Sequence, residues 1–225
     1  MESLIFVSGF ENTGTRLIPM ILEKCGYETF YKKKTNVSYD YLKGFFHTRF
    51  FKRYYFNKDN FNYFKKTLNK DIKNVKKCII KHGPICFMID DLKKHYPHAK
   101  FIHCIRKPED TLVKESFYYK DYGLYDTWNP SLENKFNFYK KWYTDDIISK
   151  NDIIIKMEDI VFDPSNKIKD LLDNLDIDYN DEILQNCINM IKPSKTIGNG
   201  NKLLKKQNKK LTDDITVFKN KFSYV

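Results

Sequence analysis

The amino-acid sequence predicts an α/β fold of three layers, in which helices flank a central, mostly parallel sheet. Two observations favour this fold. Short, nearly continuous apolar runs alternate with stretches whose apolar residues recur at helical spacing, and such strands are typical of parallel sheets covered on both faces. The first apolar run also ends in a glycine-containing turn that opens directly into a helical stretch, as in folds that bind phosphate at a helix N-terminus.

The apolar runs indicate where the strands lie. Four strands are expected, at residues 4–7, 78–80, 100–105 and 152–156. Helical spacing indicates helices at residues 15–24, 88–96, 107–121, 131–148 and 164–175, and a short helix near the end of the chain. Pro108 and Pro164 fit this assignment, because proline is favoured in the first turn of a helix.

No repeat of fixed period and no Gly/Ser-rich linker divides the chain, so residues 1–225 are expected to form a single domain. Two stretches stand apart within it. Residues 39–64 are an insert in which aromatic residues alternate with Lys and Arg, and residues 192–212 are rich in Gly, Asn and Lys. Aromatic residues at helical spacing usually pack in a core, but both stretches could also cover a binding site.

Composition narrows the class of protein. Hydrophobic residues make up 41% of the 225 residues and aromatic residues 16%, which excludes a disordered chain. The net charge of +11 favours anionic partners, although it also fits a compositional bias toward Lys. Five widely spaced cysteines with apolar neighbours indicate reduced thiols. Because the chain has no secretory signal and no apolar run that could span a membrane, a soluble cytoplasmic protein is expected.

The first candidate site is the turn after the first strand. Gly9 and Gly14 have the spacing of a P-loop, in which backbone N–H groups and a helix N-terminus cradle phosphate oxygens. Thr15 and Arg16 follow where ATP-binding loops carry Lys and then Ser or Thr. The turn is therefore P-loop-like, but a kinase or ATPase would lack its phosphate-bridging lysine and the hydroxyl that holds magnesium.

The second candidate site follows the third strand. Arg106 stands directly after this strand, and Lys114 and Ser116 follow in the next helical stretch. Ligands of α/β sheets bind at the carboxyl ends of the strands, where an arginine can hold a phosphate through two parallel hydrogen bonds. The alternative is a surface arginine that pairs with Glu109 or Asp110.

Together, these segments resemble the sulfotransferases that use 3′-phosphoadenosine 5′-phosphosulfate (PAPS). Residues 12–16 are similar to the 5′-phosphosulfate loop of that family, and residues 106–110 resemble its 3′-phosphate motif, Arg-x-Pro-x-Asp. Residues 156–164 resemble its Glu-Asp-Leu and Asp-Pro segment, and residues 196–198 are similar to the start of its cofactor-covering loop, here taken as 192–212. The four segments occur in the order of the family, over roughly residues 3–222.

The resemblance implies which residues bind the cofactor and its product, 3′-phosphoadenosine 5′-phosphate (PAP). They are Asn12, Thr13, Gly14, Thr15, Arg16, Arg106, Lys114, Ser116, Thr196, Ile197 and Gly198. Asn12 stands where the family loop carries Lys or Arg, and Arg16 or Lys81 could compensate for that missing cation. Lys114 stands where the family has a serine. It could meet the 3′-phosphate as a cation, whereas Ser116 lies about 200° further round a helix.

Catalytic residues are also implied by the resemblance. Lys81 and His82 follow the second strand, where family members carry a lysine beside the sulfuryl group. Lys81 would stabilise charge on the transferring group, and His82 would act as the base for the acceptor hydroxyl, because histidine titrates near neutral pH. Glu11 in the loop is the alternative base, and a structural role is the alternative for His82. No metal ion is expected, because no His/Cys cluster or paired Asp spacing indicates one.

The sequence therefore predicts a sulfotransferase that moves a sulfuryl group from PAPS to a hydroxyl or amine. The acceptor could be a glycan, a tyrosine or other phenol, or a small alcohol. Three alternatives remain: a catalytically impaired sulfotransferase-like protein that binds PAPS or PAP, a P-loop nucleotide or metabolite kinase, and a nucleic-acid binder that uses residues 39–64. The sulfotransferase interpretation expects no stable nucleic-acid partner and no membrane span.

Overall fold

The computed structural model describes most of the chain. The described residues are 2–10, 12–29, 59–112, 131–145, 147–192, 197–198, 200, 202 and 209–224. Of the predicted insert at 39–64, only residues 59–64 are among them.

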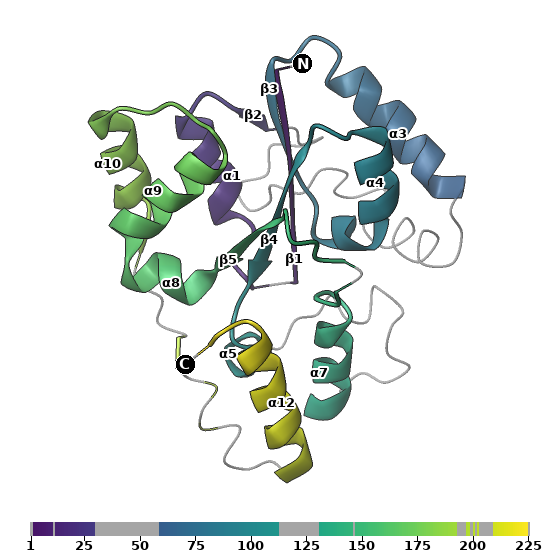
Figure 1. Ribbon diagram of the computed structural model, residues 1–225, viewed down its shortest axis with the longest axis vertical. Helices are drawn as coiled ribbons and strands as arrows, with labels where there is room; N and C mark the ends of the chain where they lie inside the picture. The colour runs from purple at the N-terminus through teal and green to yellow at the C-terminus, as the bar shows by residue number, and fades with distance from the viewer. Residues whose placement is uncertain are drawn as a thin grey trace.

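Five parallel strands form the centre of the described structure (Figure 1). They are β1 (Ser3–Gly9), β2 (Glu28–Thr29), β3 (Lys77–Lys81), β4 (Lys100–Ile105) and β5 (Ile153–Lys156). Their order is β2-β3-β1-β4-β5, so β1 lies between β3 and β4. The predicted α/β fold with a mostly parallel sheet is confirmed. All four predicted strands are present, whereas β2 was not expected.

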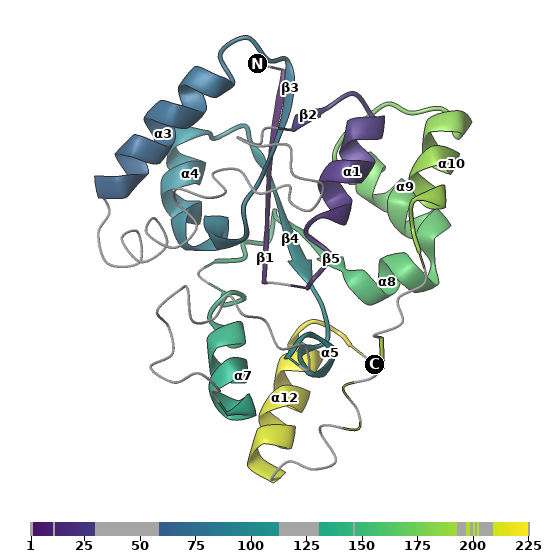
Figure 2. The same cartoon turned by 180° about the vertical axis from the view of Figure 1, so that it is seen from behind.

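Helices lie on both faces of this sheet and beyond the carboxyl ends of its strands (Figures 1 and 2). They are α1 (Leu17–Lys24), α3 (Asp59–Asp71), α4 (Ile89–His95), α5 (Pro108–Leu112), α7 (Leu132–Lys140), α8 (Met157–Phe162), α9 (Pro164–Asn174), α10 (Asp181–Asn189), α12 (Lys209–Lys221) and the 3₁₀-helix η1 (Gly83–Met88). Figures 1 and 2 show α1, α9 and α10 on one side, α3 and α4 on the other, and α5, α7 and α12 beyond the carboxyl ends of the strands. None of these described helices is long and apolar enough to cross a membrane.

The alternation of side chains along β1 explains why both faces are covered. Successive side chains of a strand point to opposite faces of the sheet. Leu4 and Phe6 belong to the core cluster that includes side chains of α3 and α4. Ile5 and Val7 belong to the cluster that includes side chains of α1, α9 and α10. An uninterrupted apolar strand such as β1 therefore needs helices on both sides.

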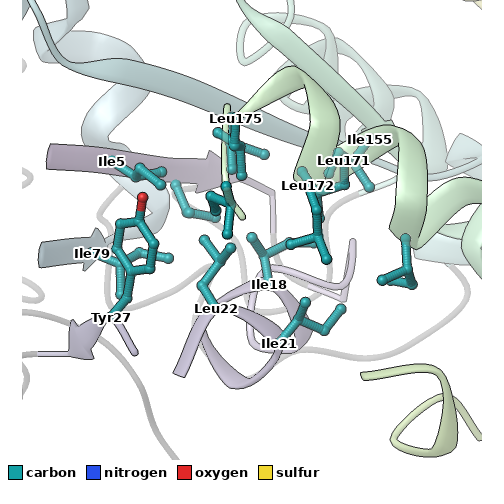
Figure 3. Close-up of a cluster of buried hydrophobic side chains, with 14 of the residues drawn as sticks. Ile5, Ile18, Ile21, Leu22, Tyr27, Ile79, Ile155, Leu171, Leu172 and Leu175 are labelled. Carbon is teal, nitrogen blue, oxygen red and sulfur yellow. The ribbon is translucent and has the colours of Figure 1, made fainter. Parts of the chain in front are cut away.

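The core on the α1 side fixes the turn that precedes α1 (Figure 3). Ile5 and Ile79 of the sheet share this cluster with Ile18 and Leu22 of α1 and with Leu172 of α9. Burying each such aliphatic side chain contributes roughly 1.5–3 kcal/mol relative to leaving it exposed. This packing holds α1, and with it the end of the turn after β1, on the sheet.

A third cluster is largely aromatic and lies beyond the carboxyl ends of the strands. Phe10, the residue after β1, packs edge-on against Tyr139 and Trp142, with ring centroids 5.1 and 5.3 Å apart. Phe218 of α12 packs edge-on against the same tyrosine, at 5.3 Å. Aromatic contacts therefore connect the turn after β1 with α7 and α12.

Two expected helices differ in their bounds. The helix expected to reach residue 148 ends at Lys140, and the prediction is wrong beyond that point. Thr144 and Asp145 follow, and both are poor helix formers. The helix expected at 107–121 is described as α5 only, and its remaining residues lie outside the described ones. All five cysteines are free in the structure.

A buried chain of polar side chains connects β1, β4 and α4. Ser8 Oγ lies 2.8 Å from His103 Nδ1, and His103 Nε2 lies 3.1 Å from Asp152 Oδ2. Lys93 of α4 donates to the same carboxylate oxygen at 2.8 Å. Burial raises the pKa of Asp152, but hydrogen bonds from His103, Lys93 and Ser149 outweigh it and lower that pKa to about 2. The residue types are those of a hydrolase triad. With side-chain exposures of 1% for His103 and 3% for Asp152, they lie inside the fold and connect β1 and β4 with α4.

Candidate active site

The turn after β1 packs closely against β4 and α8. Gly9 has φ 150°, and a Cβ there would come within 2.5 Å of the Cys104 carbonyl oxygen of β4. Gly14 has φ 87°, and a Cβ there would come within 2.5 Å of Met157 Sδ at the start of α8. Both positions require glycine, because their positive φ values disfavour other residues and because neighbouring atoms leave no room for a Cβ. The turn therefore lies tightly on the carboxyl end of the sheet.

Within this turn, polar groups divide between buried and exposed positions. Thr13 Oγ1 donates to the Phe10 carbonyl oxygen at 2.5 Å, and both Thr13 and Thr15 are buried. Asn12 and Arg16 are exposed. Arg16 occupies the N-cap position of the eight-residue α1, with no capping hydrogen bond from its side chain. The N–H groups and the helix dipole at this end of α1 favour an anion.

Arg106 lies against the same turn. It follows the last residue of β4, and its guanidinium Nη1 donates to the Asn12 carbonyl oxygen at 3.3 Å. Only 4% of its surface is exposed, so the alternative of a surface arginine is wrong. The two nearby carboxylates interact elsewhere, Glu109 with Lys219 of α12 and Asp110 with backbone N–H groups.

Lys81 and His82 lie at the carboxyl end of β3, beside the end of β1. The His82 backbone N–H donates to the Val7 carbonyl oxygen at 3.1 Å. Both side chains are buried, that of His82 completely. Burial raises the pKa of the Cys104 thiol to about 12, and the nearby Lys81 ammonium acts in the opposite direction. The Lys81 charge is therefore close to β4, at the end of the central strand.

Asp110 connects the 106–110 segment with the described part of the C-terminal stretch. Its carboxylate accepts hydrogen bonds from the backbone N–H groups of Gly198, at 2.7 Å, and Gly200, at 2.8 Å. Gly200 packs so closely on the backbone of Glu109 that a Cβ would overlap it. The residue pair Ile197–Gly198 is thus anchored beside α5.

Glu158 of α8 supports the same segment from the other side. Its Oε1 accepts a hydrogen bond from the Lys107 backbone N–H at 2.9 Å. Burial raises the pKa of Glu158, and the Lys107 hydrogen bond and the Arg106 charge oppose this rise. The Glu-Asp part of the 156–164 segment therefore holds the backbone next to Arg106.

Comparison with known proteins now decides the family. A family model described as "Sulfotransferase family" matches residues 23–181, which is well over half of the chain. The chain belongs to the sulfotransferase family. The predicted family, the sulfotransferases, is therefore confirmed. The match includes the ends of β3 and β4, whereas the turn after β1 precedes it.

The fold is similar to that of a solved sulfotransferase structure. Sulfotransferase STF9 from Mycobacterium avium has a TM-score of 0.54 at 12% identity, over 84% of this chain and 67% of that chain. Mouse sulfotransferase SULT7A1 complexed with PAP has a TM-score of 0.49 at 13% identity, over 100% of this chain and 86% of that chain. Retinol dehydratase in complex with androsterone and PAP has a TM-score of 0.43 at 15% identity, over 84% of this chain and 64% of that chain. At these identities the likeness to STF9 concerns the fold alone. No curated protein sequence matches the chain.

In this sulfotransferase, the sequence-predicted site residues fall into two groups. Those that the structure describes at or beside the carboxyl ends of the strands are Asn12, Thr13, Gly14, Thr15, Arg16, Lys81, His82, Arg106, Ile197 and Gly198. Glu11, Lys114, Ser116 and Thr196 lie outside the described residues. Within the described ranges, no three His, Cys, Asp or Glu side chains are grouped so as to hold a metal ion.

Replacing Asp110 by alanine is expected to release the 197–200 segment. The carboxylate accepts two backbone N–H groups in a buried position, so we expect the free energy of unfolding to fall by about 1–3 kcal/mol. The amides of Gly198 and Gly200 should exchange hydrogen at least about tenfold faster. Urea unfolding and hydrogen exchange measure both effects.

The matched control for this variant is Asp170→Ala. Asp170 is exposed and pairs with Lys167 on the surface of α9, so its loss should change the free energy of unfolding by less than about 0.5 kcal/mol. Unchanged exchange at both glycines in Asp110→Ala would show that the carboxylate does not hold the segment.

Proposed function

We propose that this sulfotransferase moves a sulfuryl group from PAPS to a hydroxyl or amine of its acceptor. One observation carries the proposal: the buried Arg106 guanidinium donates to the backbone of Asn12. The two segments that resemble a 3′-phosphate motif and a 5′-phosphosulfate loop therefore touch at one end of the sheet. A nucleotide with phosphoryl groups on both its 3′ and 5′ positions fits such a pair.

The residues present suit this cofactor chemically. Two cationic side chains, Arg106 and Lys81, are buried near the carboxyl end of the central strand. The hydroxyl of Thr15 and the N-terminus of α1 add neutral donors, whereas the Thr13 hydroxyl already donates to the Phe10 carbonyl oxygen. This donor set favours an anionic ligand over a neutral one.

The proposed roles follow from these positions. The 12–16 turn would bind the 5′-phosphosulfate, and Arg106 would bind the 3′-phosphate through its planar fork. Ile197 and Gly198, with Thr196, would cover the nucleotide. Lys114 or Ser116 would add a contact to the 3′-phosphate. PAPS supplies an activated sulfuryl group, and the chain supplies orientation and cations for the charge that spreads during transfer.

Proton transfer completes the proposed reaction. The acceptor oxygen forms a bond to sulfur as the bond from sulfur to the phosphate oxygen breaks, so that PAP leaves. His82 would take the proton of the acceptor hydroxyl, with Glu11 as the rival base. Lys81 would stabilise negative charge on the transferring group. As in phosphoryl transfer, positioning and electrostatics carry most of the catalysis.

Calorimetric titration tests the cofactor assignment. PAP, adenosine 5′-phosphate (AMP) and ATP with magnesium are titrated separately into the protein. Tight binding of PAP that depends on its 3′-phosphate is the expected result. A preference for ATP with magnesium would support a P-loop kinase instead, and no binding of any nucleotide would overturn the proposed function.

Asn12 supports one second candidate, a protein that binds PAPS or PAP without turnover. The loop position where the family carries a cation is an exposed asparagine here. If PAP binds but PAPS is not consumed with any phenol, alcohol or amine, this second candidate is correct.

Replacing Asn12 by lysine is expected to strengthen PAP binding by about 3- to 10-fold. A charge-assisted hydrogen bond contributes about 1.5–3 kcal/mol. Asn12 has φ 64°, which strains lysine and alanine alike with and without ligand. Because this position is exposed, solvent screens the added charge, so the net gain is modest. Asn12→Ala is the matched control, because it has the same backbone strain without the charge and should weaken binding. Equal weakening in both variants would show that this position does not face the phosphosulfate.

A further inference from the structure

We infer that Tyr139 and Tyr143 are positioning residues that hold the two phosphate-binding segments of the proposed cofactor site against each other. The inference rests on the proposed function and adds two residues to it. Tyr139 lies near the end of α7 and Tyr143 lies one helical turn later, just beyond the helix. Neither residue belongs to a segment that resembles a sulfotransferase motif.

The Tyr143 hydroxyl joins the turn after β1 to β4. It accepts a hydrogen bond from the Phe10 backbone N–H at 2.9 Å and donates one to the Cys104 carbonyl oxygen at 2.9 Å. A hydroxyl has one proton, so these two bonds use it once as acceptor and once as donor. Burial raises the pKa of Tyr143, which keeps the donor proton in place. One oxygen atom thus fixes the start of the turn relative to the end of β4.

The Tyr139 hydroxyl acts on the other segment. It donates to the Arg106 carbonyl oxygen at 2.5 Å, and its side chain is fully buried. Arg106 in turn donates through its guanidinium to the Asn12 carbonyl oxygen. The turn, the arginine and the two tyrosines therefore form one connected set of hydrogen bonds.

The hydrogen bonds of the two tyrosine hydroxyls lie at the carboxyl ends of β1 and β4, where the backbone pairing of the sheet ends. Phe10 lies one residue beyond β1, and Arg106 lies one residue beyond β4. Buried backbone N–H and C=O groups need partners, and here the tyrosine hydroxyls provide them. The edge-on packing of Phe10 on Tyr139 holds the rings themselves in place. Beyond the last strand pair, Gly9 and Cys104, the two segments are therefore held together by the side chains of Tyr139 and Tyr143.

The two hydroxyls are expected to affect different parts of the nucleotide. Tyr143 holds the turn, which would meet the 5′-phosphate that PAP and AMP share. Tyr139 holds the backbone of Arg106, which would meet only the 3′-phosphate of PAP. Tyr143→Phe should therefore weaken the binding of both nucleotides, whereas Tyr139→Phe should weaken the binding of PAP selectively. A purely structural role would lower the melting temperature without this pattern.

The test is calorimetric titration of PAP and AMP into wild type, Tyr143→Phe and Tyr139→Phe. We expect about a tenfold loss of affinity for both nucleotides in Tyr143→Phe, and about a tenfold loss for PAP with less than a twofold loss for AMP in Tyr139→Phe. Tyr96→Phe is the matched control, because the Tyr96 hydroxyl donates to Asn69 between α4 and α3, away from the site. It should bind both nucleotides like wild type.

The possible failures are distinguishable. If wild type does not bind PAP, the proposed function is overturned and the inference with it. If wild type binds PAP and both phenylalanine variants bind like Tyr96→Phe, the inference alone is overturned. Hydrogen exchange adds a readout without ligand: the Phe10 amide should exchange at least about tenfold faster in Tyr143→Phe. If Tyr143→Phe does not fold, the PAP-to-AMP affinity ratio of Tyr139→Phe decides the question.

Discussion

Replacing Arg106 by alanine is expected to remove most of the preference of the protein for PAP over AMP. The buried guanidinium stands at the end of β4 and touches the 12–16 turn. Charge-assisted, bidentate contacts to a phosphate are among the strongest hydrogen bonds in proteins, so we expect PAP affinity to fall at least about 100-fold. AMP lacks the 3′-phosphate, and its affinity should fall less than about threefold. Calorimetry with both nucleotides gives the ratio.

Two controls sharpen this result. Arg106→Lys keeps the charge but loses the planar fork, so it should restore only part of the PAP affinity. Lys167→Ala removes one positive charge from an exposed site on α9, and it should leave both affinities unchanged. Equal losses for PAP and AMP in Arg106→Ala would mean that the arginine only supports the turn through Asn12, and the 3′-phosphate role would be withdrawn.

The sheet was predictable because its strands are short apolar runs that are buried on both faces. The runs at 4–7 and 100–105 lie within the observed β1 and β4. The two-residue β2 was not predictable, since Glu28 and Thr29 lack an apolar pattern and pair only with the edge of β3. The helix α10 was missed for a related reason: only Cys187 of this helix is fully buried, so its apolar face is narrow.

The candidate site was partly predictable because parallel strands end at one edge of a sheet. That rule alone brings the turn after β1, the Lys81–His82 pair and Arg106 to the same place. The sequence did not indicate which partners hold these segments. The hydrogen bonds of Asp110 to Gly198 and Gly200 span about 90 residues of chain, and no local pattern reports such contacts. The aspartate of the Arg-x-Pro-x-Asp motif was the one signal that could have indicated an anchor there.

The tyrosines at the end of α7 illustrate the same limit of local patterns. Aromatic residues at helical spacing predict a buried face, and Tyr139 is indeed part of an aromatic cluster. Their spacing does not tell whether the hydroxyls reach water or backbone. In the structure, both hydroxyls bind backbone groups of the candidate site. A tyrosine whose helical spacing predicts a place in the core can thus also position a binding loop, through the hydrogen bonds of its hydroxyl group.

Replacing His82 by alanine is expected to lower kcat by at least about 100-fold while PAP affinity changes less than about twofold. A positioned general base contributes about 10²–10⁴-fold to a rate. The histidine backbone N–H bonds to Val7 independently of the side chain, so the end of β3 should persist in the variant. Wild type is first assayed with PAPS and a panel of phenols, alcohols and amines, with PAP release as the signal. The same acceptor is then used for the variant.

The competing explanation is that His82 is a packing residue, since its side chain is completely buried. His82→Asn separates the two explanations, because it keeps polar atoms and most of the volume but cannot serve as a base near neutral pH. If His82 is the base, both variants should lose kcat and the acid limb of the rate–pH profile. A packing role predicts a lowered melting temperature in His82→Ala with kcat retained in His82→Asn. Full activity in both, together with an inactive Glu11→Gln, would transfer the role of the base to the glutamate of the loop.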